Sequence, residues 1–544
     1  MNDKTKHRVF LGIVLVLAFF RFYDLDSLEV QPWDEAMYGV RIIAVMEFDA
    51  WLDQSEYSCG GLYSSVHPPL YIWLTAAIQS LFDINYNAFF LRFFSALSGA
   101  GLILLMYFFF EDKLSGLFSA LTLSMIPFFH YYTKIGQLDI IMTFFVMLSV
   151  FFFYKNELSA KKIWLILTGI AFGLALMSKA LIALFLPISF AFYLEVMIFY
   201  KKERWRSAIV KIMTITLTGS LLALPWHLHM YSIHGDAFLN QLFGYHLIDR
   251  AVAGVEHNIK ELGAFYYVNQ LAVMLSLALV PIFIAIRKFR ESKLIILSIM
   301  IFLVPFSIFS ISQTKLQTYT LPLLPPLALL AGIGFKELWN KKNISWYIVI
   351  ISIAFAIWSI SHELRLDIKQ LLASGNLSNT FIHYFIAGAL LSFFLVFIRK
   401  YISAKYIVAF MLLFLVVKFS ANQREPYYNS NIETASMAYA KMMNDTLTYI
   451  ETINHSGAIN PQLDYYFYGI TQEWKKNELK RRKFFYIQTL KDTFDINDII
   501  KNSAMIIVKM KDKNRQIDSL TKMIRKRTKL FLSNDIYNVY VNGY

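Results

Sequence analysis

The run LRFFSALSGAGLILLMYFFF, residues 91–110, decides the class of this protein. It is almost entirely apolar, and a helix needs about 20 such residues to cross the hydrocarbon core of a bilayer. Comparable runs recur along the chain, so this stretch predicts one crossing among many. Together they predict an all-α polytopic membrane protein with about thirteen crossings, near residues 9–23, 91–110, 117–132, 140–154, 163–177, 181–200, 212–230, 266–286, 294–311, 319–335, 344–361, 381–398 and 406–420.

The composition of the whole chain supports the same class. Of the 544 residues, 57% are hydrophobic and 17% are charged, whereas soluble domains carry about 25% charged residues. These values exclude a soluble multidomain enzyme and a disordered chain. The single cysteine, Cys59, leaves no intrachain disulfide and no cysteine-based metal site.

The net charge of +14 predicts a membrane topology rather than a nucleic-acid partner. Basic residues gather in alternate connections, and such residues favour the cytoplasmic side. The N-terminus is therefore expected in the cytoplasm, on a retained first span. With an odd number of spans, the C-terminus lies outside. About 22 Lys or Arg residues fall in residues 1–8, Lys113, 155–162, 201–211, 287–293, 336–342 and 399–405.

Two segments outside the spans are expected on the outer face. The first outer loop, residues 24–90, contains an apolar segment at 69–82 that is too short to cross and predicts an interfacial helix. Residues 421–544 change in composition and predict a small soluble α/β domain after the membrane domain of residues 1–420. Its expected strands are Phe484–Gln488, Met505–Met510 and Tyr537–Val541, and its expected helices are 433–450, 491–501 and 513–527.

With this topology, the ionisable residues outside the basic connections all fall on the outer face, where such clustering needs a reason. Carboxylates and cations at one membrane surface suit an anionic lipid substrate with a hydroxyl or phosphate acceptor. These residues are Asp34, Glu35, His67, Lys134, Asp139, Lys179, His227, His246, Arg250, His257 and Lys315.

The acidic candidates each have a structural alternative. Asp34 and Glu35 suit either a favourable first helical turn or a general base acting on an acceptor hydroxyl. Asp139 lies at the mouth of a span, where capping of that helix is the structural alternative. His67, before Pro68-Pro69, is either structural or a phosphate or metal ligand.

The basic candidates also allow more than one interpretation. Lys179 interrupts two apolar runs, so it either reaches the interface or binds a lipid phosphate. His246 and Arg250 are spaced i, i+4 and share a face if their segment is helical. Lys315 and Tyr319 have the same spacing and, like Arg250, are suitable phosphate donors.

The order of these motifs resembles that of a known family. The motifs are Asp34-Glu35-Ala36, His67-Pro68-Pro69-Leu70, Leu138-Asp139-Ile140, Ser178-Lys179-Ala180, Pro225-Trp226, His246 with Arg250, and Lys315-Leu316 with Tyr319-Thr320-Leu321-Pro322. Over residues 9–335 they are similar to the bacterial GT-C glycosyltransferases that use polyprenyl phosphate, the family of the lipid A aminoarabinose transferases and the protein O-mannosyltransferases.

This resemblance implies transfer of a sugar from a polyprenyl (undecaprenyl) phosphate carrier to a lipid A, glycan or protein acceptor on the periplasmic face of the inner membrane. It implies catalytic roles for Asp34, Glu35 and Asp139. It implies carrier-phosphate binding by His67, Lys179, His246, Arg250, Lys315 and Tyr319. No cofactor is certain, and a divalent metal stays open. The aminoarabinose branch carries Glu-Lys before Pro-Pro, where this chain has Val66-His67, so a proposed metal ligand is lost and neither sugar nor acceptor carries over.

The alternative from another class is a transporter or flippase for a lipid-linked sugar. Transporters more often show internal repeats and ionisable residues near the membrane midplane. Here the charges gather at one face and a soluble domain follows, which favours the transferase.

Overall fold

The computed structural model describes residues 3–58, 60–82, 84, 87–202, 204–255, 262–341, 404–421, 432–439, 447–450, 461–466, 484–487, 500–501, 503–509, 521–533 and 537–542. The chain divides into two compact units. The first unit comprises residues 1–23, 94–134 and 138–425, and the second comprises 24–93, 135–137 and 426–544. The predicted first outer loop thus groups with the C-terminal tail.

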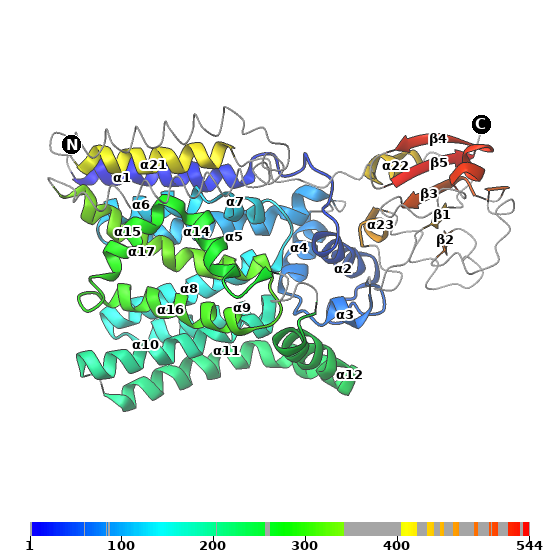
Figure 1. Cartoon of the computed structure of the whole chain (residues 1–544). Coiled ribbons are helices and arrows are strands. Elements are labelled where there is room, and N and C mark those ends of the chain that lie inside the picture. The colour runs from blue at the N-terminus through cyan, green and yellow to red at the C-terminus, as the bar shows by residue number, and fades with distance from the viewer. Residues whose placement is uncertain are drawn as a thin grey trace. The chain divides into compact units, whose positions relative to one another are not determined.

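The first unit is built from helices (Figure 1). In chain order they are α1 (Asp3–Phe19), η1 (Phe20–Phe22), α5 (Ala88–Phe108, of which residues 88–93 lie in the second unit), α6 (Lys113–Ser124), α7 (Pro127–Thr133), α8 (Leu138–Ser159), α9 (Lys162–Ala183), α10 (Phe185–Lys201), α11 (Trp205–His234), α12 (Asp236–Leu239), η2 (Asn240–Ala253), α14 (Tyr266–Leu275), η3 (Ser276–Ala278), α15 (Leu279–Ile286), α16 (Lys293–Ile311), η4 (Gln317–Leu323), α17 (Leu324–Trp339) and α21 (Ala404–Ala421).

The polytopic class is confirmed, whereas the number of thirteen crossings stays a prediction. Seven helical segments of the described chain are long and apolar enough to cross a membrane, or eight if one bent pair forms a single crossing. The expected spans 344–361 and 381–398 lie outside the described residues.

The expected span at 117–132 is bent rather than continuous. Helices α6 and α7 meet there at an angle of 75°. Ile126 is extended, and Pro127 opens α7. Proline lacks the N–H that a continuous helix would need, but it suits the first position of a new one.

Close contacts between glycines and neighbouring helices hold α9 against α11. A Cβ on Gly173 would lie 2.9 Å from the carbonyl oxygen of Gly219, and one on Gly169 would lie 2.6 Å from the Cβ of Thr218. Small residues allow such approach, which favours association of helices in lipid. The G-x-x-x-G spacing of Gly169 and Gly173 therefore builds this packing.

Several ion pairs link the basic connections to one another at one end of the first unit. Lys336 pairs with Asp112 at 3.0 Å and Lys288 with Glu337 at 2.8 Å. The buried carboxylate of Glu157 accepts hydrogen bonds from Lys211 and from Lys293, the latter at 3.3 Å. Five of the basic connections predicted to share one membrane face are linked in this way.

The second unit combines helices from the first loop with a mixed sheet from the tail. Its helices are α2 (Asp34–Phe48), α3 (Leu62–Ser65), α4 (Leu70–Leu81), α22 (Ile432–Tyr439) and α23 (Pro461–Tyr466). Its strands are β1 (Leu447–Ile450), β2 (Phe484–Ile487), β3 (Met505–Lys509), β4 (Thr528–Ser533) and β5 (Tyr537–Asn542). Helix α4 has 12 residues, too short to cross a membrane, as predicted.

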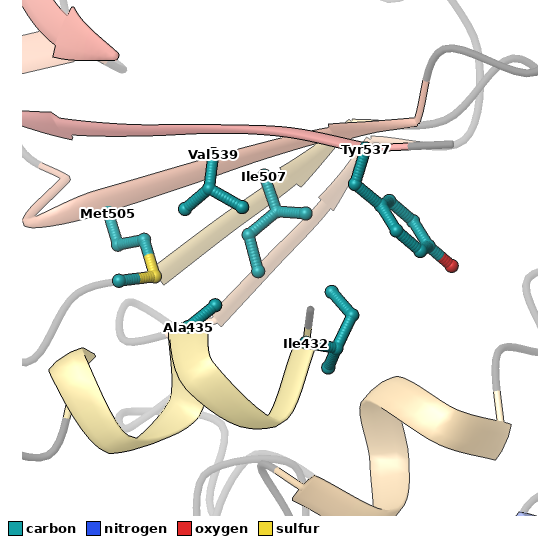
Figure 2. Close-up of a cluster of buried hydrophobic side chains, with 6 residues drawn as sticks. All are labelled: Ile432, Ala435, Met505, Ile507, Tyr537 and Val539. Carbon is teal, nitrogen blue, oxygen red and sulfur yellow. The ribbon is translucent and has the colours of Figure 1, made fainter. Parts of the chain in front are cut away.

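The sheet has five strands in the order β2-β1-β3-β5-β4. Strand β1 pairs in parallel with β2 and β3, and β5 pairs antiparallel with β3 and β4. Figure 2 shows the core of this α/β region, where Ile432 and Ala435 of α22 pack on Met505 and Ile507 of β3 and on Val539 of β5. Burial of this apolar face holds α22 on the sheet.

The three expected strands are confirmed, but the expected helix 433–450 is wrong in its second half. Helix α22 ends at Tyr439, and Leu447–Ile450 forms β1. The sequence LTYI has the β-branched and aromatic residues of a strand, and its two parallel neighbours supply the backbone hydrogen bonds. Strand β4 follows a run of Lys and Arg and was not expected. Most of the expected helices 491–501 and 513–527 lies outside the described residues.

Candidate active site

The two acidic residues that open α2 lie in different surroundings. Asp34 is half-buried in the first turn, and Glu35 is fully buried, with 0% exposure. Acidic side chains are favourable at this position because of the helix dipole. Trp33, just before them, has a φ of 70°, which is rare for a residue with a bulky side chain. The surrounding structure must therefore hold the turn that presents Asp34.

Glu35 holds this turn in place through its hydrogen bonds. Its carboxylate accepts two hydrogen bonds from Arg92, at 2.7 and 2.9 Å, in a bidentate ion pair. It also accepts from the backbone N–H groups of Gln31, at 2.6 Å, and Gly136, at 2.7 Å. A buried charge is stable only when paired and hydrogen-bonded to this degree. Glu35 thus ties the start of α2 to α5 and to the segment 135–137.

Arg92 was not among the residues predicted from the sequence. It is 1% exposed, and its guanidinium also donates to the carbonyl groups of Leu25, Leu28 and Glu29. Arg92 is the one charged residue in the apolar run 91–110. A charge within an apolar run is costly without a partner, and this is the signal that could have found it.

His67 lies where the loop meets α4, half-buried. Its carbonyl oxygen accepts a hydrogen bond from Arg41 of α2 at 2.9 Å. The buried Arg41 also donates to Gln54 and to the carbonyl of Ser64. Burial lowers the pKa of Arg41 to about 10, so it remains charged at neutral pH. Arg41 therefore fixes the backbone on which His67 is carried.

In the first unit, Asp139 and Lys179 form a buried ion pair. The ammonium of Lys179 donates to both carboxylate oxygens, at 2.9 and 2.8 Å. Asp139 lies in the first turn of α8. Lys179 interrupts α9 with an extended backbone, φ −152° and ψ 83°. The sequence predicted both residues for the site but not their pairing across 40 positions.

His246 and Arg250 lie in η2, which is a π-helix rather than the α-helix in which an i, i+4 spacing places two residues on one face. The guanidinium of Arg250 lies 5.7 Å from the ring centre of Tyr245. The carbonyl of Arg250 accepts from Thr314 N at 2.9 Å, which joins η2 to the segment before Lys315. Two predicted phosphate-binding segments are thus brought together. π-helical turns are rare and are frequent at functional sites.

Lys315 and Tyr319 do not share a helical turn, because η4 begins only at Gln317. The buried Lys315 ammonium donates to the carbonyls of Phe309, Ser310 and Ser312 at 3.0, 2.7 and 2.6 Å. These bonds use its three N–H groups at the end of α16, so binding a phosphate would require one of them to open. Tyr319 is buried and stacks on Phe309, with ring centres 4.7 Å apart.

His227 and Lys134, which the sequence also placed on the outer face, contact aromatic rings. His227 faces Trp226 and Phe238, and its Nδ1 lies 2.9 Å from the carbonyl oxygen of Ala223. Lys134 lies over the ring of Tyr23. His257 is outside the described residues. Among the residues the structure describes, no group of three or more His, Cys, Asp or Glu side chains could hold a metal ion.

Comparison with known proteins shows what this chain is similar to. Residues 12–235 match the model of the dolichyl-phosphate-mannose-protein mannosyltransferase family. The undecaprenyl phosphate-alpha-4-amino-4-deoxy-L-arabinose arabinosyl transferase 1 of Pseudomonas fluorescens is 29% identical over 334 residues, which are 58% of this chain and 56% of that protein. The corresponding transferase of Pseudomonas aeruginosa is 28% identical, over 59% and 58%. The chain thus matches little more than half the length of these relatives.

Solved structures share the fold at low sequence identity. ArnT from Cupriavidus metallidurans bound to undecaprenyl phosphate superimposes with a TM-score of 0.66 and 16% identity, over 100% of this chain and 99% of that one. The oligosaccharyltransferase of Archaeoglobus fulgidus in the apo form gives 0.53 and 12%, over 99% and 75%. The resemblance predicted from the motifs is therefore confirmed: this chain is similar in sequence to the mannosyltransferase family model and to the arabinosyl transferases, and it shares its fold with ArnT.

Proposed function

We propose that this protein is a multi-pass inner-membrane glycosyltransferase. It moves a sugar from a polyprenyl (undecaprenyl) phosphate carrier to a lipid A, glycan or protein acceptor on the periplasmic face. Its N-terminus is cytoplasmic and its tail periplasmic. The relatives named for transfer from undecaprenyl phosphate support the donor class, and the paired basic connections at one end support the topology.

The observation that carries the proposal is the presentation of Asp34. This half-buried carboxylate follows a residue with a positive φ, and its neighbour Glu35 is tied down by four hydrogen bonds. A general base works best when it is held in place before the substrate arrives. Because Glu35 is fully buried and Asp34 is half-buried, Asp34 is the acidic residue of the pair that we assign to the substrate.

The reaction we propose is a single displacement. The acceptor oxygen bonds to the anomeric carbon, the bond from that carbon to the carrier phosphate oxygen breaks, and the acceptor proton passes to Asp34. An acceptor phosphate is already ionised, and Asp34 then orients it. Polyprenyl phosphate leaves as an anion and needs positive charge rather than a proton. Lys179 and Arg250 would provide it, with His67, His246, Lys315 and Tyr319 as further donors, and the sugar configuration inverts.

Replacement of Asp34 by Asn tests the proposal. The purified protein is incubated in detergent with radiolabelled polyprenyl-phosphate sugars and a membrane lipid extract. We expect label to leave the carrier with the wild-type protein and transfer to fall at least about a hundredfold in Asp34→Asn, as for loss of a general base. The control is Asp49→Asn at the exposed end of α2, where φ is 53° and Asn is well tolerated.

Other outcomes separate the alternatives. Wild-type activity in Asp34→Asn removes this residue from catalysis, and retention of the sugar configuration contradicts single displacement. If no carrier donates its sugar while a lipid-linked sugar crosses the membrane of proteoliposomes, the protein is a transporter rather than a transferase.

A further inference from the structure

The segment before Asp34 is held by a helix that comes more than 400 residues later. Val30 is 1% exposed, and its N–H donates to the hydroxyl of Tyr466 at 2.8 Å. Its carbonyl accepts from the side-chain amide of Gln462 at 2.8 Å. Both side chains belong to α23 in the tail. Buried backbone groups need such partners, and here α23 supplies both for one residue.

Two more contacts fasten the same segment to the tail. The carboxylate of Glu29 accepts a hydrogen bond from the backbone N–H of Glu433, at 2.9 Å, at the start of α22. On α2, a Cβ added to Gly39 would lie 2.6 Å from the ring of Tyr465, so the glycine makes room for α23. The tail therefore contacts both the segment 29–31 and the helix that begins at Asp34.

We propose that Tyr466 and Gln462 are positioning residues for sugar transfer: through Val30 they hold the segment 29–31 that sets the place of Asp34. The proposal rests on the function proposed above. It gives the C-terminal tail a specific task, because α22 and α23 of the tail hold the segment 29–31 that precedes Asp34.

The geometry explains why the segment needs this support. Residues 24–33 form turns and irregular backbone rather than a helix or a strand. The N–H of Gln31, next to Val30, donates to Glu35, and Trp33 keeps its positive φ. A small displacement at Val30 is therefore passed to Gln31, Glu35 and the first turn of α2. Misplacement of a reacting group by about 1 Å can cost about a hundredfold in rate.

The first test compares two tyrosines of the tail. Tyr466→Phe removes the acceptor for Val30 N, whereas Tyr540→Phe removes a hydrogen bond from Arg525 that lies within the tail. We expect kcat for transfer to fall about tenfold or more in Tyr466→Phe, with the KM for the polyprenyl-phosphate sugar unchanged. Tyr540→Phe should keep wild-type kcat. A melting curve of each variant separates positioning from loss of the fold.

The second test is rescue at Glu29. Glu29→Ala removes the acceptor for the N–H of Glu433, and Glu29→Gln keeps an acceptor oxygen without the charge. We expect kcat to fall in the alanine variant and to return in the glutamine variant. Hydrogen exchange at residues 29–37 should rise in Glu29→Ala and in Tyr466→Phe.

The outcomes distinguish this proposal from the function on which it rests. If the wild-type protein transfers sugar and Tyr466→Phe keeps its kcat, the positioning role is overturned and the transferase stands. Equal loss in Tyr466→Phe and Tyr540→Phe also overturns it, because the effect is then general to the tail. If the wild-type protein transfers nothing, both proposals fall together.

Discussion

At the residue scale, the adjacent side chains of Asp34 and Glu35 lie in different surroundings. Glu35 is buried against Arg92 and two backbone N–H groups, whereas Asp34 remains half-buried. Successive residues of a helix point about 100° apart, so one can face the core while the other faces an opening. The catalytic role predicted for Glu35 stays untested, and its contacts favour an anchoring role.

The ion pair of Asp139 with Lys179 carries a prediction at the same scale. Lys179→Met removes the cation beside a buried carboxylate, which costs about 3–5 kcal/mol for pairs of this kind. We expect a clearly lower melting temperature in detergent. The double variant Lys179→Met with Asp139→Leu should recover most of that stability, because an apolar pair can replace a buried ion pair.

Transfer separates a structural role of this pair from a functional one. We expect the stable double variant to remain inactive in the radiolabel assay, since Lys179 is proposed to bind the carrier phosphate. Wild-type transfer by the double variant would assign the pair to structure alone.

At the element scale, small residues decide how closely helices approach. The contact of α9 with α11 depends on Gly169, Gly173 and Gly219, each of which leaves no room for a Cβ. Gly173→Leu should force the helices apart and lower stability by about 1–3 kcal/mol, as overpacking does. A thermal melt of the detergent-solubilised variant measures this.

Gly12 in α1 is the matched control. A Cβ there meets nothing within 4 Å, and leucine favours a helix more than glycine does, so Gly12→Leu should not lower the melting temperature. Equal melting temperatures for the two leucine variants would contradict the proposed role of the α9 and α11 contact.

At the scale of the whole molecule, the linked basic connections predict which residues face the cytoplasm. In a Cys59→Ser background, Ser159→Cys lies in the basic connection 155–162 and Glu56→Cys in the first outer loop, both at exposed positions. A membrane-impermeant maleimide should label Glu56→Cys in intact cells and Ser159→Cys only after permeabilisation. The reverse pattern would invert the proposed topology.

Much of the membrane fold could be predicted from the sequence, because apolar length is a local property. The runs at 91–110, 140–154 and 163–177 coincide with α5, α8 and α9. The bend at Pro127 and strand β1 were missed, since a neighbouring helix or strand decides whether an apolar stretch continues. The candidate residues could be identified because they are charged residues in apolar surroundings. Which of them form ion pairs with one another could not be predicted.

The sequence by itself determined the membrane class, the alternation of basic connections and the acidic and basic residues worth testing. Apolar length and charge count are sufficient for these, since each acts over a few residues. Only the tertiary structure decided that Glu35 meets Arg92, that Asp139 meets Lys179 and that Tyr466 supports Val30. These contacts join positions 40 to 436 residues apart, and they form because a buried charge or backbone group must find a partner wherever the fold places one.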